Sequence, residues 1–409
     1  MRRRGSRRRS SGEWVVRGAL AAAAAVAGYF GVTHSLAQAV MKRDAAFAHG
    51  LAPWDGRITA ARAISLAEAA TLPADRRPAD ALARLALRQD PTAVAAVSTL
   101  GISAQLRGDT EGARRLFTYA EKLSRRDLPT QLWAIEDAVE RNDIPGALRH
   151  YDIALRSKRQ SWDLLFPVLA AASADPQVRT ELVKTLAAKP LWADGFIPYV
   201  AANGTDPRST AALFLGARGA GLAIPENAHA RVINALLSDD SAEDAWRYYA
   251  AVRRGVDRHR SRDPHFTHAT EVPTAFDWTP ISGVGLTTSI QQGENGGIFD
   301  FMAPASVGGP LLQQVQMLPP GTYDIEGHGS GIDVEPAARP YWALVCRSDD
   351  RELGRVVLPN SAQGNGSFAG SFTVPAGCPV QALRLVARAS QGIAGLSGQI
   401  DRIQLRPAR

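Results

Sequence analysis

The character of the chain changes sharply near residue 260, and this change limits the folds that are open to it. From about Lys42 to Val256, alanine, leucine and arginine dominate, and apolar residues recur at helical spacing. From Thr274 onward glycine becomes frequent, and short runs alternate between apolar and polar residues. With 409 residues the chain is also too long for one compact core. We therefore predict a multidomain protein, helical over 42–256 and β over 274–409, with a polar linker at 257–273.

Residues 1–41 predict a segment that directs the chain to a membrane. The 24 residues from Gly18 to Met41 contain no Lys, Arg, Asp or Glu. As a helix they would be roughly 36 Å long, enough to cross a hydrocarbon layer of ~30 Å. An uncleaved transmembrane anchor fits this length best. A cleavable signal peptide is the alternative, because Ala37-Gln38-Ala39 has the small-x-small pattern that a signal peptidase reads. A soluble amphipathic helix fits least, because the segment has no polar face.

The net charge of +7 is concentrated ahead of this segment. Residues 1–17 contain seven arginines and one glutamate, a net of +6, which leaves +1 for the rest of the chain. A nucleic-acid partner is therefore not expected, since it needs a basic excess on a folded surface. By the positive-inside rule, the arginines place the N-terminus in the cytoplasm of a bacterium. We expect a single-pass inner-membrane protein facing the periplasm, or a cleaved periplasmic one.

Two cysteines occur, Cys346 and Cys378, both in the C-terminal half. In an exported chain they are expected to form a disulfide, although two buried free thiols are the alternative. Two cysteines alone do not supply the four ligands of a structural zinc site.

The helical half repeats itself at a spacing of 34 residues. This spacing superimposes small residues on small ones and Phe117 on Tyr151, and it also superimposes the turn at Gly108-Asp109 on the turn at Asn142-Asp143. The pattern resembles the tetratricopeptide repeat over about residues 60–155. It departs from the repeat where Ala134-Ile135 replaces the expected Leu-Gly and where Ala83 replaces an aromatic residue. The residues that we assign to packing between paired helices are Gly101, Ala113, Phe117, Ala120, Ala147, Tyr151 and Ala154.

The resemblance implies a solenoid with a concave surface that holds a peptide or an envelope protein. Six arginines would line a basic groove there if they face one side, but a solvated helix face is the favoured interpretation. They are Arg114, Arg115, Arg125, Arg126, Arg149 and Arg156. In the linker, His259, His265 and His268 have no acidic or thiol partner at ligand spacing, so we expect no metal site.

Eight short runs in the C-terminal half predict an antiparallel β-sandwich. They cover 297–302, 311–318, 322–327, 341–346, 355–358, 366–374, 381–387 and 398–405. Turn signals such as Pro319-Pro320-Gly321 separate them.

Several stretches resemble the galactose-binding-like jelly roll of carbohydrate-binding modules. They include Phe276-Asp277-Trp278, the strand that begins at Trp342 and the closing strand Ile400-Asp401-Arg402-Ile403-Gln404-Leu405. The resemblance implies an accessory domain that faces a glycan or a protein and performs no hydrolysis. Exposed aromatics beside amides and carboxylates would bind the sugar. The candidates are Trp278, Tyr341, Trp342, Asn295, Asp300 and Gln292.

For each of these aromatics, core packing is the favoured alternative, since one of Tyr341 and Trp342 must face the core. A calcium ion braces some members of the fold, but Glu294, Asp300 and Asp401 form no contiguous loop motif here.

No catalytic motif is found: the sequence lacks a nucleophile elbow, a zinc-protease helix and a phosphate-binding loop. We expect no catalytic residues, cofactor or metal. The leading hypothesis is a periplasm-facing scaffold in surface polysaccharide assembly or export. Its repeats would hold envelope proteins, and its sandwich would meet a polysaccharide. A purely protein-binding scaffold is the second hypothesis, and a glycoside-active enzyme with an unrecognised carboxylate pair is the third.

Overall fold

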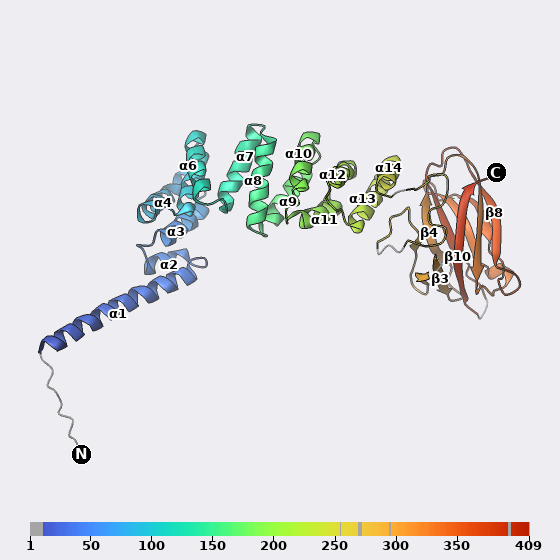
Figure 1. Cartoon of the computed structure of the whole chain (residues 1–409), viewed down its shortest axis with the longest axis horizontal. Helices are drawn as coiled ribbons and strands as arrows, with labels where there is room; N and C mark the ends of the chain where they lie inside the picture. Colours follow the sequence, from blue (N-terminus) through green and yellow to red (C-terminus); the bar gives the residue numbers. More distant parts are fainter. Residues whose placement is uncertain (1–10, 254, 269–271, 294–295, 392–393, 409) are drawn as a thin grey trace, which may run out of the picture. The chain divides into compact units, whose positions relative to one another are not determined.

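The chain is described here from a computed structural model that places residues 11–253, 255–268, 272–293, 296–391 and 394–408. These residues form a helical N-terminal part followed by two antiparallel β-sheets (Figure 1), which confirms the predicted fold class. The chain divides into two compact units, Met1–Leu165 and Phe166–Arg409, and the second unit contains the last helices as well as both sheets.

The helical part begins with α1, Ser11–Val40. Among the described residues its stretch Gly12–Val40 is the one helix long and apolar enough to be a membrane span or a signal sequence. The helices that follow are α2 Ala45–Leu51, α3 Gly56–Ala69, α4 Arg77–Gln89, α5 Val94–Leu106, α6 Thr110–Leu123, α7 Leu128–Glu140, α8 Ile144–Ser157, α9 Ser161–Ala172, α10 Pro176–Ala187, α11 Ala193–Asn203, α12 Pro207–Gly219, α13 Glu226–Ser238 and α14 Ala242–Val252.

Two turns that match in sequence at the 34-residue spacing also match in conformation. Asp109 caps α6 by accepting a hydrogen bond from the Gly112 N–H at 2.8 Å, and Asp143 caps α8 by accepting one from the Gly146 N–H at 2.9 Å. Gly108 and Asn142, one residue before each cap, both have positive φ. The same local chemistry therefore starts both second helices.

Small side chains allow the paired helices to approach closely. A Cβ placed on Gly101 of α5 would lie 2.8 Å from Cε2 of Phe117 in α6, and the Phe117 ring stacks on Trp133 at 4.6 Å. All seven residues assigned to helix packing are buried: Gly101, Ala113, Phe117, Ala120, Ala147, Tyr151 and Ala154.

The two five-stranded sheets have the orders β1-β4-β9-β6-β7 and β2-β3-β10-β5-β8, and all their pairings are antiparallel. Consecutive strands therefore often lie in opposite sheets, as is typical of a sandwich. The strands are β1 Thr279–Pro280, β2 Thr287–Gly293, β3 Gly296–Ala303, β4 Gly309–Gln316, β5 Gly321–Ser330, β6 Tyr341–Cys346, β7 Glu352–Val357, β8 Ser367–Val374, β9 Gln381–Ala387 and β10 Leu396–Pro407.

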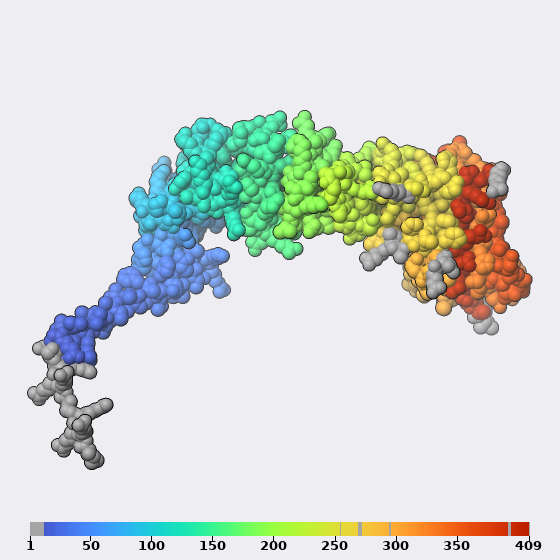
Figure 2. Space-filling model, viewed as in Figure 1, coloured from blue at the N-terminus to red at the C-terminus, as the bar shows by residue number. Residues whose placement is uncertain are grey.

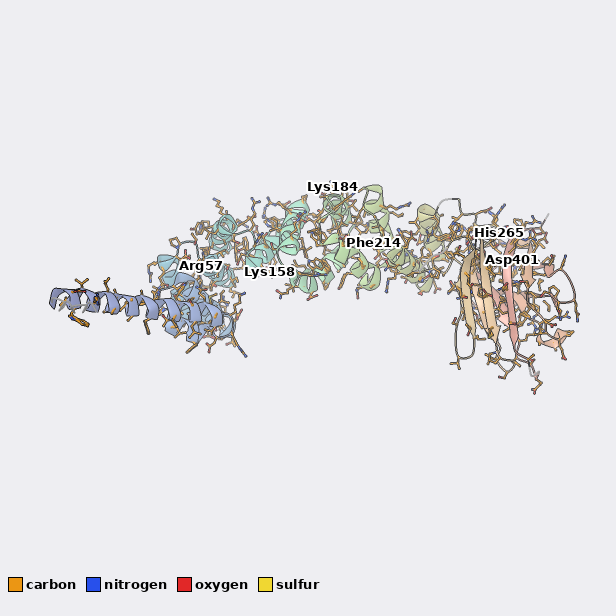
Figure 3. All side chains as sticks on the ribbon, turned by 60° about the horizontal axis from the view of Figure 1, so that its bottom comes forward. Arg57, Lys158, Lys184, Phe214, His265 and Asp401 are labelled. Carbon is orange, nitrogen blue, oxygen red and sulfur yellow. A yellow bond between two sulfur atoms is a disulfide. The ribbon has the colours of Figure 1, made fainter. Side chains whose placement is uncertain are left out.

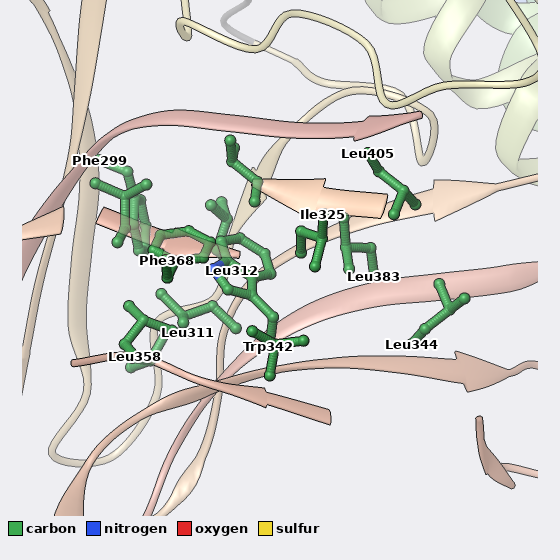
Figure 4. Close-up of a cluster of buried hydrophobic side chains, with 14 of the residues drawn as sticks. Phe299, Leu311, Leu312, Ile325, Trp342, Leu344, Leu358, Phe368, Leu383 and Leu405 are labelled. Atoms are coloured by element: carbon green, nitrogen blue, oxygen red, sulfur yellow. The ribbon is translucent and has the colours of Figure 1, made fainter. Parts of the chain in front are cut away.

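Alternation along the strands builds the sandwich core. In β5 and β8, apolar or glycine positions face inward, and polar positions and Ala369 face outward. Trp342 lies at the centre, fully buried, among leucine, isoleucine and phenylalanine side chains from both sheets (Figure 4). The predicted Cys346–Cys378 disulfide is confirmed, and it joins the end of β6 to the loop before β9.

Candidate functional site

The outer face of sheet β2-β3-β10-β5-β8 is polar and holds a groove of about 590 Å³. His265 lines one side of the groove, and β3, β5, β8 and β10 supply the other lining side chains. Figure 3 labels His265 and Asp401, which both line the groove. The lining residues are His265, Gly293, Gly296, Gly297, Ile298, His328, Ser367, Asp401 and Arg402.

An irregularity in β10 brings two charged side chains into this groove. The register with β5 shifts between Ile400 and Arg402, so that Asp401 and Arg402 are both exposed between the buried Ile400 and Ile403. A β-bulge of this kind redirects side chains relative to the regular alternation. The groove therefore contains a carboxylate and a guanidinium on consecutive residues.

Asp401 and His328 form the polar centre of the groove. Nδ1 of His328 lies 2.8 Å from Oδ2 of Asp401, and both side chains are partly exposed. On the next strand, Ser367 is the direct cross-strand neighbour of His328. Arg402 makes no ion pair with any residue that the structure describes. The cluster thus offers a ligand hydrogen-bond acceptors, a serine hydroxyl and the guanidinium group of Arg402.

Glycines form the base of the groove because backbone segments approach each other there. A Cβ on Gly297 would lie 2.3 Å from the carbonyl oxygen of Phe266, and the Gly297 N–H donates a hydrogen bond to the His265 carbonyl at 2.8 Å. Gly366, with φ of +71°, passes so close to Gly329 that a Cβ would meet its carbonyl oxygen at 1.9 Å. Any larger residue at Gly297 or Gly366 would therefore displace these segments.

The polar surface continues along the same face. Gln399 donates a hydrogen bond to Oδ1 of Asp300 at 2.7 Å, and Arg406 pairs with Glu326 at 3.0 Å. The described outward positions of these five strands carry no phenylalanine, tyrosine or tryptophan. Recognition on this face would therefore depend on hydrogen bonds and charge rather than on ring stacking.

The sequence-based sugar-binding candidates lie in different places. Trp278 and Trp342 are buried in the core with ring centroids 5.8 Å apart, and Nε1 of Trp278 donates to the Asp263 carbonyl at 2.9 Å. Their ring faces are covered by core neighbours. Asp300 lies on the polar outer face, near the groove, and Gln292 donates to the Phe266 carbonyl at 2.9 Å. Asn295 and Glu294 lie outside the described residues.

Tyr341 lies on the opposite sheet, and two arginine side chains lie over its ring. The guanidinium carbon of Arg355 is 4.2 Å from the ring centroid, and that of Arg388 is 4.9 Å away. These cation–π contacts occupy the ring that was expected to stack on a sugar.

A second polar cluster, which the sequence did not reveal, lies where the last helix meets the sandwich. Arg262 is 7% exposed and is enclosed by α14, the Phe276 segment and β4. It donates to the Phe276 carbonyl at 2.9 Å, to Oε1 of Gln316 at 3.0 Å and to the carbonyl of Val315. Burial lowers the pKa of Arg262 to about 10, so the side chain is still charged at neutral pH.

The cluster continues onto α14 through Tyr249. Its hydroxyl donates to Oδ1 of Asp277 at 2.9 Å, and burial raises the pKa of Tyr249. A cavity of about 350 Å³ lies beside these residues, lined in part by the predicted linker. That linker is packed: Arg258 donates to the Met317 carbonyl at 2.9 Å, and Ser261 exchanges hydrogen bonds with Leu405.

In the helical part, a groove of about 410 Å³ runs past Asp137, Trp133 and His150. Burial alone would raise the pKa of Asp137, but hydrogen bonds from Arg114 and Arg141 outweigh it and lower that pKa. Two of the six arginines proposed for a basic groove are thus engaged in ion pairs, Arg114 with Asp137 and Arg156 with Asp152.

No protein-family model and no curated protein matches the chain. Solved structures resemble it in part. The CBM22-1 xylan-binding domain of Paenibacillus barcinonensis Xyn10C is 12% identical, with a TM-score of 0.24 over 36% of this chain and 92% of that one. The CBM22-1-GH10 modules of a Clostridium thermocellum endo-1,4-beta-D-xylanase are 10% identical, with a TM-score of 0.24 over 37% of this chain and 28% of theirs.

The enzymatically active domain of bacteriophage CBA120 tailspike protein 4 is also similar, at 10% identity and a TM-score of 0.24, over 33% of this chain and 20% of that one. Similarity at this level decides nothing about the ligand or the activity of this chain.

Proposed function

We propose that the chain is a non-enzymatic, membrane-tethered scaffold whose sandwich binds a polysaccharide in the groove around His328 and Asp401. The observation that carries this proposal is the set of exposed polar groups that the β10 bulge gathers over a glycine base. Sugar hydroxyls both donate and accept hydrogen bonds, so a carboxylate, an imidazole and a serine hydroxyl in one open groove suit them. Arg402 favours a glycan that carries carboxylate or sulfate groups.

The helical part supports the scaffold role in this proposal. Paired helices present extended surfaces to partner proteins, and the groove beside Asp137 and Trp133 is a concavity with polar and apolar lining in this part. We place the action of the protein in the assembly or export of a surface polysaccharide, at the periplasmic side of the inner membrane.

The test is binding of the full-length chain, held in lipid nanodiscs, to a panel of neutral and acidic bacterial polysaccharides. Saturable binding to one of them is expected, measured by calorimetry. Asp401→Asn and His328→Ala should each weaken it at least about tenfold, because a hydrogen bond to a charged group contributes roughly 1.5 to 3 kcal/mol. Arg402→Gln should weaken binding of acidic glycans most.

The matched control is Tyr341→Ala, which alters the opposite sheet and should leave the affinity unchanged. Loss of binding in this variant, with wild-type affinity in Asp401→Asn, would move the site to the opposite sheet. Absence of binding across the panel would overturn the glycan role and leave the protein scaffold, which crosslinking through the helical part would then test. Formation of new reducing ends during the same incubations would show hydrolysis and would replace the binding role with an enzymatic one.

A further inference from the structure

The helix α1 has two parts with different surroundings. From Gly12 to Val32 all its side chains are exposed except that of Glu13, which is partly buried. Figure 2 shows this blue stretch extending away from the helices of the same unit that follow it. From Thr33 to Val40 the same helix packs against the folded helices that follow. The boundary between the two parts therefore lies within a continuous helix.

The packed part is integral to the first unit. Ala37 is fully buried in a cluster with Ala48, Ala52 and Ile58. Oδ2 of Asp55 accepts a hydrogen bond from Gln38 at 3.2 Å, while Oδ1 of the same carboxylate caps α3. The small-x-small motif Ala37-Gln38-Ala39 is thus helical and partly buried. Proteolytic cleavage favours exposed, flexible backbone, whereas this motif is helical and its Ala37 is fully buried.

Aromatic side chains lie close to the point where the exposed part ends. Tyr29 and Phe30 are in edge contact, and the Phe30 ring meets Trp54 with centroids 5.1 Å apart. Phe47 projects from α2, the helix that packs on the end of α1. Their exposed fractions are 65% for Tyr29, 47% for Phe30, 52% for Phe47 and 47% for Trp54, which is unusual for large rings near a packed cluster.

From these observations we infer that α1 is retained in the mature protein and that these four rings, the aromatic collar, insert into the lipid headgroup region and dock the first helices on the bilayer. Aromatic side chains prefer the membrane–water interface, where one end is apolar and the other is wet. Trp14 takes the equivalent place at the other end of the apolar stretch. Trp14 and Tyr29 are roughly 22 Å apart along the helix, which is shorter than the hydrocarbon layer of ~30 Å, so the bilayer would have to thin around α1.

We expect the aromatic collar to contact lipid rather than another protein, because it directly follows the exposed apolar part of α1. Lys42 and Arg43, both exposed directly after α1, are suited to the phosphates of the same interface. Docking would hold α2 and α3 against the membrane and limit how far the rest of the chain can move from it.

The test uses the full chain with one added cysteine carrying an environment-sensitive fluorophore, since the native cysteines are paired in a disulfide. Phe47→Cys places the label in the collar. Leu106→Cys, also exposed but on α5, is the matched control. In liposomes we expect blue-shifted emission for Phe47→Cys and quenching by lipids brominated near the headgroup. The Leu106→Cys label should keep the emission of a water-exposed probe and should not be quenched by the brominated lipids.

Identical emission from both labels would overturn the docking. A second measurement addresses retention: the intact mass of the chain purified from the producing cells is expected to include residues 1–39. A chain that begins at Val40 would overturn the whole inference. Neither result depends on glycan binding, so the glycan role and this inference fail separately, whereas cleavage before Val40 would also remove the membrane tether of the proposed function.

Discussion

The side-chain amide of Gln314 forms two hydrogen bonds with the backbone of Arg262, one to its N–H and one to its carbonyl. Oε1 of Gln314 accepts from the Arg262 N–H at 3.1 Å, and its Nε2 donates to the Arg262 carbonyl at 3.0 Å. A buried glutamine on β4 therefore bonds the backbone at Arg262, in the segment between α14 and β1, as a neighbouring strand would. The guanidinium of the same arginine then reaches the Phe276 carbonyl and packs over the Trp246 ring of α14. One residue thus joins the last helix to the sandwich.

We expect Arg262→Met to destabilise the second unit by about 3 kcal/mol, because it leaves buried carbonyl and amide acceptors without a donor. Hydrogen exchange of β4 peptides across a denaturant series measures the loss in the full chain. Arg260→Met, an exposed arginine paired with Asp257, is the matched control and should change stability by less than about 0.5 kcal/mol. Equal effects of the two substitutions would contradict the role assigned to Arg262.

The sequence predicted the sandwich strands well because their alternation is strong. Each of the eight predicted runs overlaps an observed strand, from β3 to β10. The strands β1 and β2 were missed for physical reasons. β1 has two residues, one of them proline, and the described side chains of β2 are mostly exposed, with Ile290 as its one large apolar residue. A run with so little apolar alternation is not distinguishable from a loop.

The candidate site was harder to predict than the fold. Two of the aromatic candidates for sugar binding, Trp278 and Trp342, are buried in the core, so their rings are not accessible to a sugar. The bulge did leave a signal: Asp401 and Arg402 stand together between two isoleucines, which breaks the period of two. The Arg262 cluster left none, because it depends on a segment without periodicity that packs against distant glutamines.

Gly101→Leu should destabilise the first unit by about 1 to 3 kcal/mol through overpacking. The added atoms would meet the Phe117 ring, which is itself held against Trp133. Hydrogen exchange of α5 and α6 peptides reports the change. Gly50→Ala, where a Cβ has no neighbour within 4 Å, is the control and should be neutral or slightly stabilising. An unchanged α5–α6 pair in Gly101→Leu would contradict the close approach of these helices.

The stability of the second unit should fall on both sides of neutral pH because of one buried pair. Nδ1 of His229 lies 2.7 Å from the Tyr248 hydroxyl. Burial lowers the pKa of His229 and raises the pKa of Tyr248. Below pH about 6.5 the unfolded chain binds a proton that the folded histidine excludes, so the free energy of unfolding decreases. Above pH about 10 the unfolded tyrosine releases a proton that the folded one retains, which again favours unfolding.

His229→Gln keeps an acceptor for the tyrosine but does not titrate. We expect it to reduce the loss of stability between pH 7 and pH 5, measured by hydrogen exchange of α13 and α14 peptides. The control is His259→Gln, an exposed histidine beside Asp257. An acid dependence that is unchanged in His229→Gln would exclude this histidine as its source.

Replacing both Cys346 and Cys378 with alanine should destabilise the sandwich by about 3 kcal/mol, because the disulfide restricts the unfolded chain. The bond spans 32 positions and encloses β7 and β8, so its loss frees a long loop in the unfolded state. Exchange of β6 and β9 peptides, compared between the double variant and the wild type, gives the difference. The wild type treated with a reductant serves as the control for cavities left by the substitutions and should match the double variant closely. If oxidised wild type and double variant exchange equally, the disulfide contributes nothing to the stability of these strands.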